Sequence, residues 1–126
     1  MQNNNPKPKI ELKKRAYLYA LSIIKFLDRL DKTDFTVQII LKQLLRSATS
    51  VGANIVEALA GSTRKDFTNF FGYALKSANE SKFWLGLLRD SGIAQKEEVD
   101  ILLKETNELS NILGSSILTL KGNKKL

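Results

Sequence analysis

Residues 46–71, RSATSVGANIVEALAGSTRKDFTNFF, contain the end of one long helix and the start of the next. In this stretch and just before it, apolar residues recur at steps of four and three, which is the spacing of one helix face. These residues are Val37, Leu41, Leu44, Ala48, Val51, Ile55 and Ala58. Gly52 and Ala53 lie beside them, so this face is thin and a second helix can pack closely against it. We expect Gly61 to end the helix in a left-handed conformation, which glycine adopts at little cost.

The same spacing predicts three more helices. The four expected helices cover residues 10–30, 37–60, 64–90 and 95–120. The inward positions of the first are Ala16, Ala20, Ile23, Leu27 and Leu30, with Tyr17, Leu21 and Ile24 beside them. Those of the third are Phe67, Phe71, Ala74, Ala78, Ser81, Leu85 and Leu88, and those of the fourth are Val99, Leu102, Thr106, Leu109, Leu113, Ser116 and Leu120. The polar links predict helix caps at Thr33 or Thr36 and at Thr63.

Links of a few residues favour antiparallel neighbours. The sequence therefore predicts an all-α protein, an antiparallel up-down-up-down four-helix bundle over residues 10–120. Residues 1–9 and 121–126 are expected to be flexible basic tails, since Pro6 and Pro8 oppose helix formation. No pattern typical of a strand competes with this interpretation.

A chain of 126 residues is long enough for one domain, and it contains neither cysteine nor histidine. These absences exclude the common zinc sites and catalysis by thiolate or imidazole. We therefore expect no metal, no cofactor and no enzymatic activity; the alternative is a metal-dependent nuclease that uses Glu57 and Glu80. No uncharged apolar run reaches the roughly 18 residues of a membrane span, and the first residues lack the apolar region of a signal peptide. We expect a cytoplasmic protein that does not contact membrane.

The net charge of +7 belongs entirely to the two ends of the chain, because residues 16–120 contain as many acidic as basic residues. The predicted topology places both ends beside the turn that precedes Arg64. We expect this basic end to bind the phosphates of RNA. The candidate residues are Lys7, Lys9, Lys13, Lys14, Arg15, Arg64, Lys65, Lys121, Lys124 and Lys125. The alternative is that these charges only keep the protein soluble.

Tyr73, Trp84 and Leu87 fall outside the inward face of the third helix. Aromatic residues on a second helical face are typical of subunit interfaces, so we expect a homo-oligomer in which these residues are covered. The alternative is that Trp84 lies on the flank of a wide core.

A polar set follows the second helix at helical spacing and has one member on the third. It consists of Arg46, Ser50, Asn54, Glu57 and Glu80. We interpret it as a hydrogen-bonded network that fixes the packing of helices or subunits. A ligand site is the alternative interpretation.

Several of these segments carry a family resemblance. The segments are Arg46-Ser47, residues 51–58 (VGANIVEA), residues 64–67 (RKDF), Ala74-Leu75, Glu80 and Gly92-Ile93. With the leucine pattern of the fourth helix, they resemble the bacterial four-helix-bundle proteins encoded within intervening sequences of 23S ribosomal RNA genes. The resemblance implies a homo-oligomer, a pentameric ring for example, and an association with ribosomal RNA loci.

Residues 112–117 (ILGSSI) are also similar to a related branch, the accessory variability proteins of diversity-generating retroelements, which associate with a reverse transcriptase and its RNA. The predicted function is a noncatalytic oligomer that binds RNA nonspecifically through its basic ends. The alternative is a scaffold that binds a protein such as a reverse transcriptase.

Overall fold

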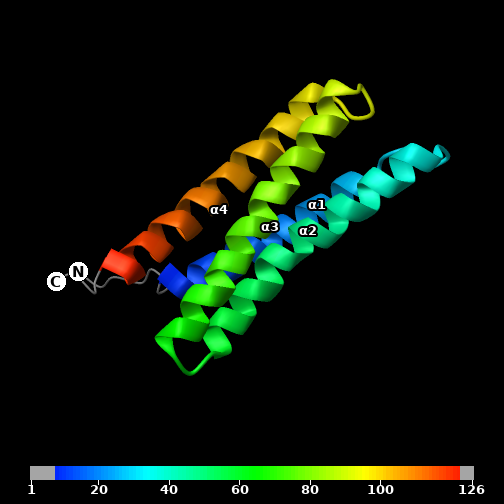
Figure 1. The fold of residues 1–126 in the computed structure, drawn as a ribbon. Helices are drawn as coiled ribbons and strands as arrows, with labels where there is room; N and C mark the ends of the chain where they lie inside the picture. Colours follow the sequence, from blue (N-terminus) through cyan, green and yellow to red (C-terminus); the bar gives the residue numbers. More distant parts are fainter. Residues whose placement is uncertain (1–7, 123–126) are drawn as a thin grey trace, which may run out of the picture.

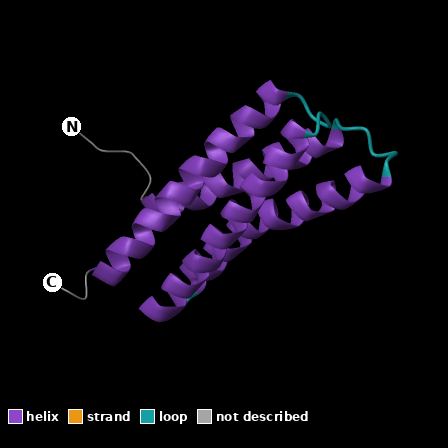
Figure 2. Ribbon diagram, turned by 45° about the horizontal axis from the view of Figure 1, so that its top comes forward, coloured by secondary structure: helices purple, strands orange, loops and turns teal. Residues whose placement is uncertain are grey.

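The computed structural model describes residues 8–122, with side chains from residue 11 onward, and contains four helices. They are α1 (Pro8–Asp28), α2 (Phe35–Ala60), α3 (Arg64–Asp90) and α4 (Lys96–Gly122). Successive helices reverse direction, so the start of α1, the turn at 61–63 and the end of α4 lie at one end of the bundle (Figure 1). The other two links lie together at the opposite end (Figure 2). The predicted four-helix bundle is confirmed, and no strand occurs within residues 8–122.

The first link ends in a helix cap that the sequence analysis assigned to the wrong residue. Asp34 caps α2, because its carboxylate accepts hydrogen bonds from the backbone N–H groups of Thr36 at 2.7 Å and Val37 at 3.3 Å. The prediction of Thr33 or Thr36 is therefore wrong. A carboxylate at this position also interacts favourably with the positive end of the helix dipole, which a hydroxyl does not.

At the start of α3 the predicted cap is confirmed, since the Thr63 hydroxyl accepts a hydrogen bond from the Asp66 backbone N–H at 3.0 Å. Gly61 does end α2, but with φ −69° and ψ 151° its backbone is extended rather than left-handed. The chain leaves α2 directly into the extended conformation that the Thr63 cap requires. The left-handed glycine is Gly92, with φ 79°, in the link after α3.

Three of the four predicted core stripes are confirmed over most of their length. The buried apolar residues of these three helices are Leu41, Leu44, Ala48, Val51, Ile55 and Ala58 of α2, Phe71, Ala74, Ala78, Leu85 and Leu88 of α3, and Val99, Leu102, Leu109 and Leu113 of α4. The predicted core residues nearest the helix ends are less buried: Val37, Phe67 and Leu120 are half-buried.

The predicted face of α1 is partly wrong. Tyr19 and Phe26, which the pattern did not select, are almost completely buried, whereas Tyr17 and Ile24 are exposed. Residues 16–27 are apolar almost all round the helix, so the spacing alone does not define one face. The packing of α1 on its neighbours decides which of its apolar residues become core.

The helices pack against one another unequally. α2 and α3 share the most extensive contact, and it includes the buried Ser47 and Ser81, whose hydroxyls lie 2.8 Å apart. α1 approaches α2 at Gly52, where an added Cβ would lie 3.6 Å from the Cβ of Ala16. Among the helices that pack side by side, α1 and α4 share the least extensive contact. One bond across this contact is buried, between the hydroxyls of Tyr19 and Thr106, which lie 2.7 Å apart.

The phenol of Tyr19 makes stability depend on pH. Burial raises its pKa from the ordinary 10.0 to about 12, against the smaller opposing effect of the hydrogen bond with Thr106. The unfolded chain therefore loses this proton at a lower pH than the folded chain. The stabilisation that comes from the protonated Tyr19 phenol is fully present below pH 10. We expect the free energy of unfolding to fall by about 2–3 kcal/mol as pH rises towards 12. Urea unfolding of the wild type and of Tyr19→Phe at several pH values measures this pH dependence. The variant has no phenol at this position, so it should not show the part of the stability loss that Tyr19 causes.

Candidate nucleic-acid interface

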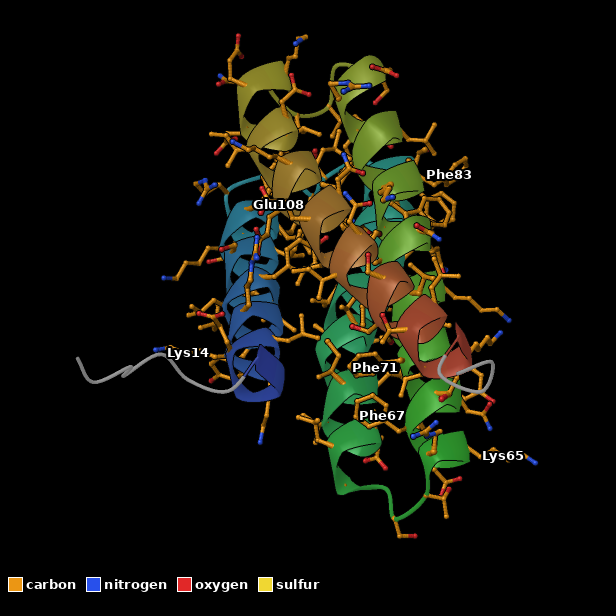
Figure 3. All side chains as sticks on the ribbon, turned by 90° about the vertical axis from the view of Figure 1, so that its left-hand side faces the viewer. Lys14, Lys65, Phe67, Phe71, Phe83 and Glu108 are labelled. Carbon is orange, nitrogen blue, oxygen red and sulfur yellow. The ribbon has the colours of Figure 1, made fainter. Side chains whose placement is uncertain are left out.

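Five cations gather where α1 begins, α2 turns into α3 and α4 ends. We call this the basic end, and its cations are Lys13, Lys14, Arg64, Lys65 and Lys121. All five are exposed, and none forms an ion pair with another described residue. Lys14 and Lys65 point to opposite flanks of this end (Figure 3). The predicted Lys7, Lys124 and Lys125 lie outside the described residues, as does the side chain of Lys9.

Arg15 is a sixth predicted RNA-binding cation, but unlike the other five it forms ion pairs. Its guanidinium donates two hydrogen bonds to the Glu105 carboxylate, each at 2.8 Å, and another to Glu108. Hydrogen bonds with Glu105 and then Glu108 raise the pKa of Arg15 above its ordinary value. Two carboxylates already neutralise this charge, so Arg15 joins α1 to α4 and is not a free phosphate ligand.

Replacing Arg15 by Gln is therefore expected to affect stability and not RNA affinity. The loss removes charge-assisted hydrogen bonds at a partly exposed site and leaves two neighbouring carboxylates, so we expect unfolding to become easier by about 1–2 kcal/mol. Thermal and urea unfolding measure the change. Lys14→Gln, one residue away and without an ion pair, is the matched control and should stay within about 0.5 kcal/mol of the wild type.

The remaining arginines sharpen this contrast. Arg29 pairs with Glu98, Arg46 with Glu80, and Arg89 with two aspartates, so four of the five arginines are held by carboxylates. Arg64 is the exception within the described residues. Carboxylates therefore offset the charge of the other arginines, whereas the cations of the basic end have no such partner among the described residues, and an excess of positive charge attracts a polyanion.

Two adjoining hollows lie between α3 and α4 at the basic end. The first, of about 430 Å³, is lined by Arg64, Lys65 and Lys121 among others. The second, of about 410 Å³, continues along α3 to Tyr73 and Lys76. They share Thr68, Asn69 and Lys121. Sequence reasoning missed Asn69 and Lys76, although their spacing of seven residues along α3 could have indicated a shared face.

The three predicted interface residues lie in different surroundings. Tyr73 is 51% exposed and borders the second hollow. Trp84 is half-buried, packs against the core and donates its indole N–H to Glu80 at 2.9 Å. Leu87 is partly exposed farther along α3, near Phe83, which is 59% exposed and points away from the bundle (Figure 3).

The predicted polar set is brought together only in part. Arg46 and Glu80 form an ion pair across α2 and α3, and Gln43 and Trp84 bond to it. Ser50 and Asn54 donate instead to backbone carbonyls of their own helix, and no described residue bonds to the exposed side chain of Glu57. The set is a local link between two helices, extended by two residues that the spacing did not select.

A separate apolar groove of about 490 Å³ runs between α1 and α2, and the sequence did not predict it, because Tyr17 was expected beside the inward face of the first helix. Its lining includes small residues such as Ala20 and Ala53. The exposed side chains of Tyr17 and Val56 also line it, together with Lys13 and Lys14 of the basic end. We call it the α1–α2 groove.

Within residues 8–122, no three carboxylates lie close enough together to hold a metal ion. None of the four helices described contains an apolar stretch long enough to cross a membrane. The chain is a helical bundle with an unpaired cationic end and an exposed apolar groove.

The comparisons with known proteins identify the family. Residues 8–115 match the family of 23S rRNA-intervening sequence proteins, and the chain belongs to this family. A similar fold occurs in the crystal structure, at 1.70 Å resolution, of a protein of unknown function of the S23 ribosomal protein family from Bacteroides thetaiotaomicron. The two sequences are 36% identical, the match covers 84% of this chain and 97% of the other, and the TM-score is 0.76. No curated protein matches the chain.

Proposed function

We propose that this chain is a noncatalytic, cytoplasmic RNA-binding protein that acts as a homo-oligomer and contacts RNA phosphates through its basic end. The observation that carries the proposal is the group of five exposed cations that form no ion pair with any described residue. Phosphate contacts supply affinity for any RNA, while selection of a sequence requires contacts with bases. The family to which the chain belongs makes ribosomal RNA the first RNA to test.

Assembly would multiply this charge. Tyr17 and Val56 on one side of the bundle, and Phe83 and Leu87 on another, leave apolar surface uncovered in the single chain. A closed ring, of five subunits for example, would cover such surfaces and bring the basic ends together on one face. Light scattering should give the mass of an oligomer, and Phe83→Glu should reduce it; a monomeric wild type would contradict this part of the proposal.

The salt dependence of RNA binding tests the phosphate contacts. About five contacts give a slope of log affinity against log salt near −4. Replacing Lys13, Lys14, Lys65 and Lys121 by Gln together should reduce the slope by about 3 and the affinity about a thousandfold at 0.1 M salt. Fluorescence anisotropy with a labelled ribosomal RNA fragment measures both.

A matched variant separates position from total charge. Replacing Lys25, Lys42, Lys82 and Lys104 by Gln removes the same charge from the rest of the bundle, and we expect it to preserve most of the slope. Equal losses in the two variants would contradict binding at the basic end.

A protein-binding scaffold is the second candidate, and the α1–α2 groove is the observation that favours it. A groove lined by apolar atoms suits a helix of another protein, such as a reverse transcriptase. A complex that survives nuclease treatment and high salt, and is lost in Tyr17→Glu, would support this function. The same complex lost on nuclease treatment would support RNA binding.

A further inference from the structure

We propose that the two adjoining hollows between α3 and α4 form one groove that binds single-stranded RNA, with Tyr73 stacking on an unpaired base. This inference rests on the proposed RNA-binding function and adds the form of RNA and the face that receives it. We call the site the α3–α4 groove. Its working residues are Arg64, Lys65, Asn69, Tyr73, Lys76 and Lys121.

The charge of the groove suits a phosphate chain. Arg64, Lys65, Lys76 and Lys121 are exposed and form no ion pair with any described residue. From Arg64 to Lys76 the groove follows α3 for about 18 Å, at 1.5 Å per residue. Several consecutive phosphates of one strand can therefore each meet a cation, which a single cluster at the helix end does not allow.

The aromatic ring is what selects a single strand. Tyr73 is 51% exposed, and its neighbour Phe70 meets it edge-on, with ring centres 5.7 Å apart and an interplanar angle of 83°. This contact orients the ring and leaves area for stacking. Every base has a flat face that can stack on such a ring, but in a duplex these faces are already covered by neighbouring pairs.

Asn69 supplies the polar contact that stacking lacks. It lies one helical turn before Tyr73, is exposed, and lines both hollows. Its amide can donate to and accept from the edge of an unpaired base. Cations on both helices, an oriented ring and a free amide along one groove are the combination that proteins use for single-stranded nucleic acid.

The test compares one labelled 12-nucleotide RNA as a single strand and as a duplex with its complement, using the full chain at 0.1 M salt. We expect the single strand to bind more tightly. Tyr73→Ala should weaken its binding about 5- to 100-fold, with the duplex affinity unchanged within about twofold, and Tyr73→Phe should retain most of the affinity. Lys76→Gln should reduce the salt slope by about 0.7–0.9.

Two controls use comparable side chains elsewhere. Phe35→Ala removes another exposed aromatic ring, at the start of α2 and at the opposite end of the bundle, and Lys104→Gln removes another exposed lysine of α4; neither should change binding by more than about twofold. Circular dichroism and light scattering on every variant verify folding and assembly.

The outcomes separate this inference from the proposed function. Wild-type protein that binds neither RNA at low salt would defeat both. Equal affinity for single strand and duplex, or an unchanged Tyr73→Ala, would overturn the groove and leave phosphate binding intact. A Tyr73→Ala variant that loses its oligomeric mass together with RNA binding would place Tyr73 at a subunit contact and also overturn the groove.

Discussion

Replacing Tyr19 by Ala is expected to lower the free energy of unfolding by about 3–5 kcal/mol. The side chain is 2% exposed and is among the largest fully buried side chains of the core. Removing it leaves a void that neighbouring helices refill only in part, because α1 is held at Gly52 by close contact with Ala16. The Thr106 hydroxyl keeps its bond to the carbonyl of Leu102, so the expected loss comes chiefly from the cavity.

Two variants isolate the cause. Tyr19→Phe keeps the ring and should cost about 1 kcal/mol, the usual value of one buried hydrogen bond. Leu18→Ala shortens the neighbouring side chain, which is 50% exposed, and should stay within about 0.5 kcal/mol of the wild type. Urea unfolding followed by circular dichroism measures all three. A Tyr19→Ala variant as stable as Leu18→Ala would contradict the placement of α1.

The second large effect has the opposite sign. Replacing Gly72, Gly86 and Gly114 together by Ala should raise the free energy of unfolding by about 1.5–3 kcal/mol, or about 0.5–1 kcal/mol each. All three lie inside long helices, and an added Cβ would meet no atom within 4 Å. The methyl groups therefore restrict the unfolded chain without straining the folded one.

The matched contrast is Gly92→Ala. This glycine also has open space around it, but its φ of 79° is unfavourable for any residue with a Cβ. We expect a loss of about 1–2 kcal/mol. Thermal unfolding of both variants decides the point: a triple variant no more stable than the wild type would show that backbone entropy does not limit these helices.

The sequence predicted α2, α3 and α4 well because each has one stripe of apolar residues that continues in steps of three and four along the helix. It failed in part for α1, where the apolar residues nearly surround the helix: Tyr17, expected beside the inward face, is exposed, and the buried Tyr19 was not selected. Which apolar residues of α1 become buried depends on its contacts with the other helices, and the spacing of residues along one helix carries no information about those contacts. Gly61 and Asp34 were misjudged for a related reason, since the path of the link decides the backbone angles at a helix end.

The sequence predicted where in the bundle the candidate site lies, but not which residues form it. Alternating helix directions were enough to bring the first lysines of α1 to the same end of the bundle as the start of α3 (Figure 1). Whether a cation forms an ion pair depends on the register between helices, which places Arg15 next to Glu105 and Glu108. Tyr73 was selected as an apolar residue in need of cover, and only its position beside Lys76 and Lys121 indicates a different partner.

The contact between α1 and α4 makes ionic strength act twice on this protein. Ion pairs at Arg15 and, just after α1, at Arg29 link this part of the chain to α4, which α1 contacts less extensively than it contacts α2. Added salt that screens RNA phosphates also weakens these exposed pairs. If added salt loosens the first helix, the apparent RNA affinity falls for a reason other than phosphate screening. Helicity and amide hydrogen exchange of residues 12–28 should therefore be measured in every salt titration.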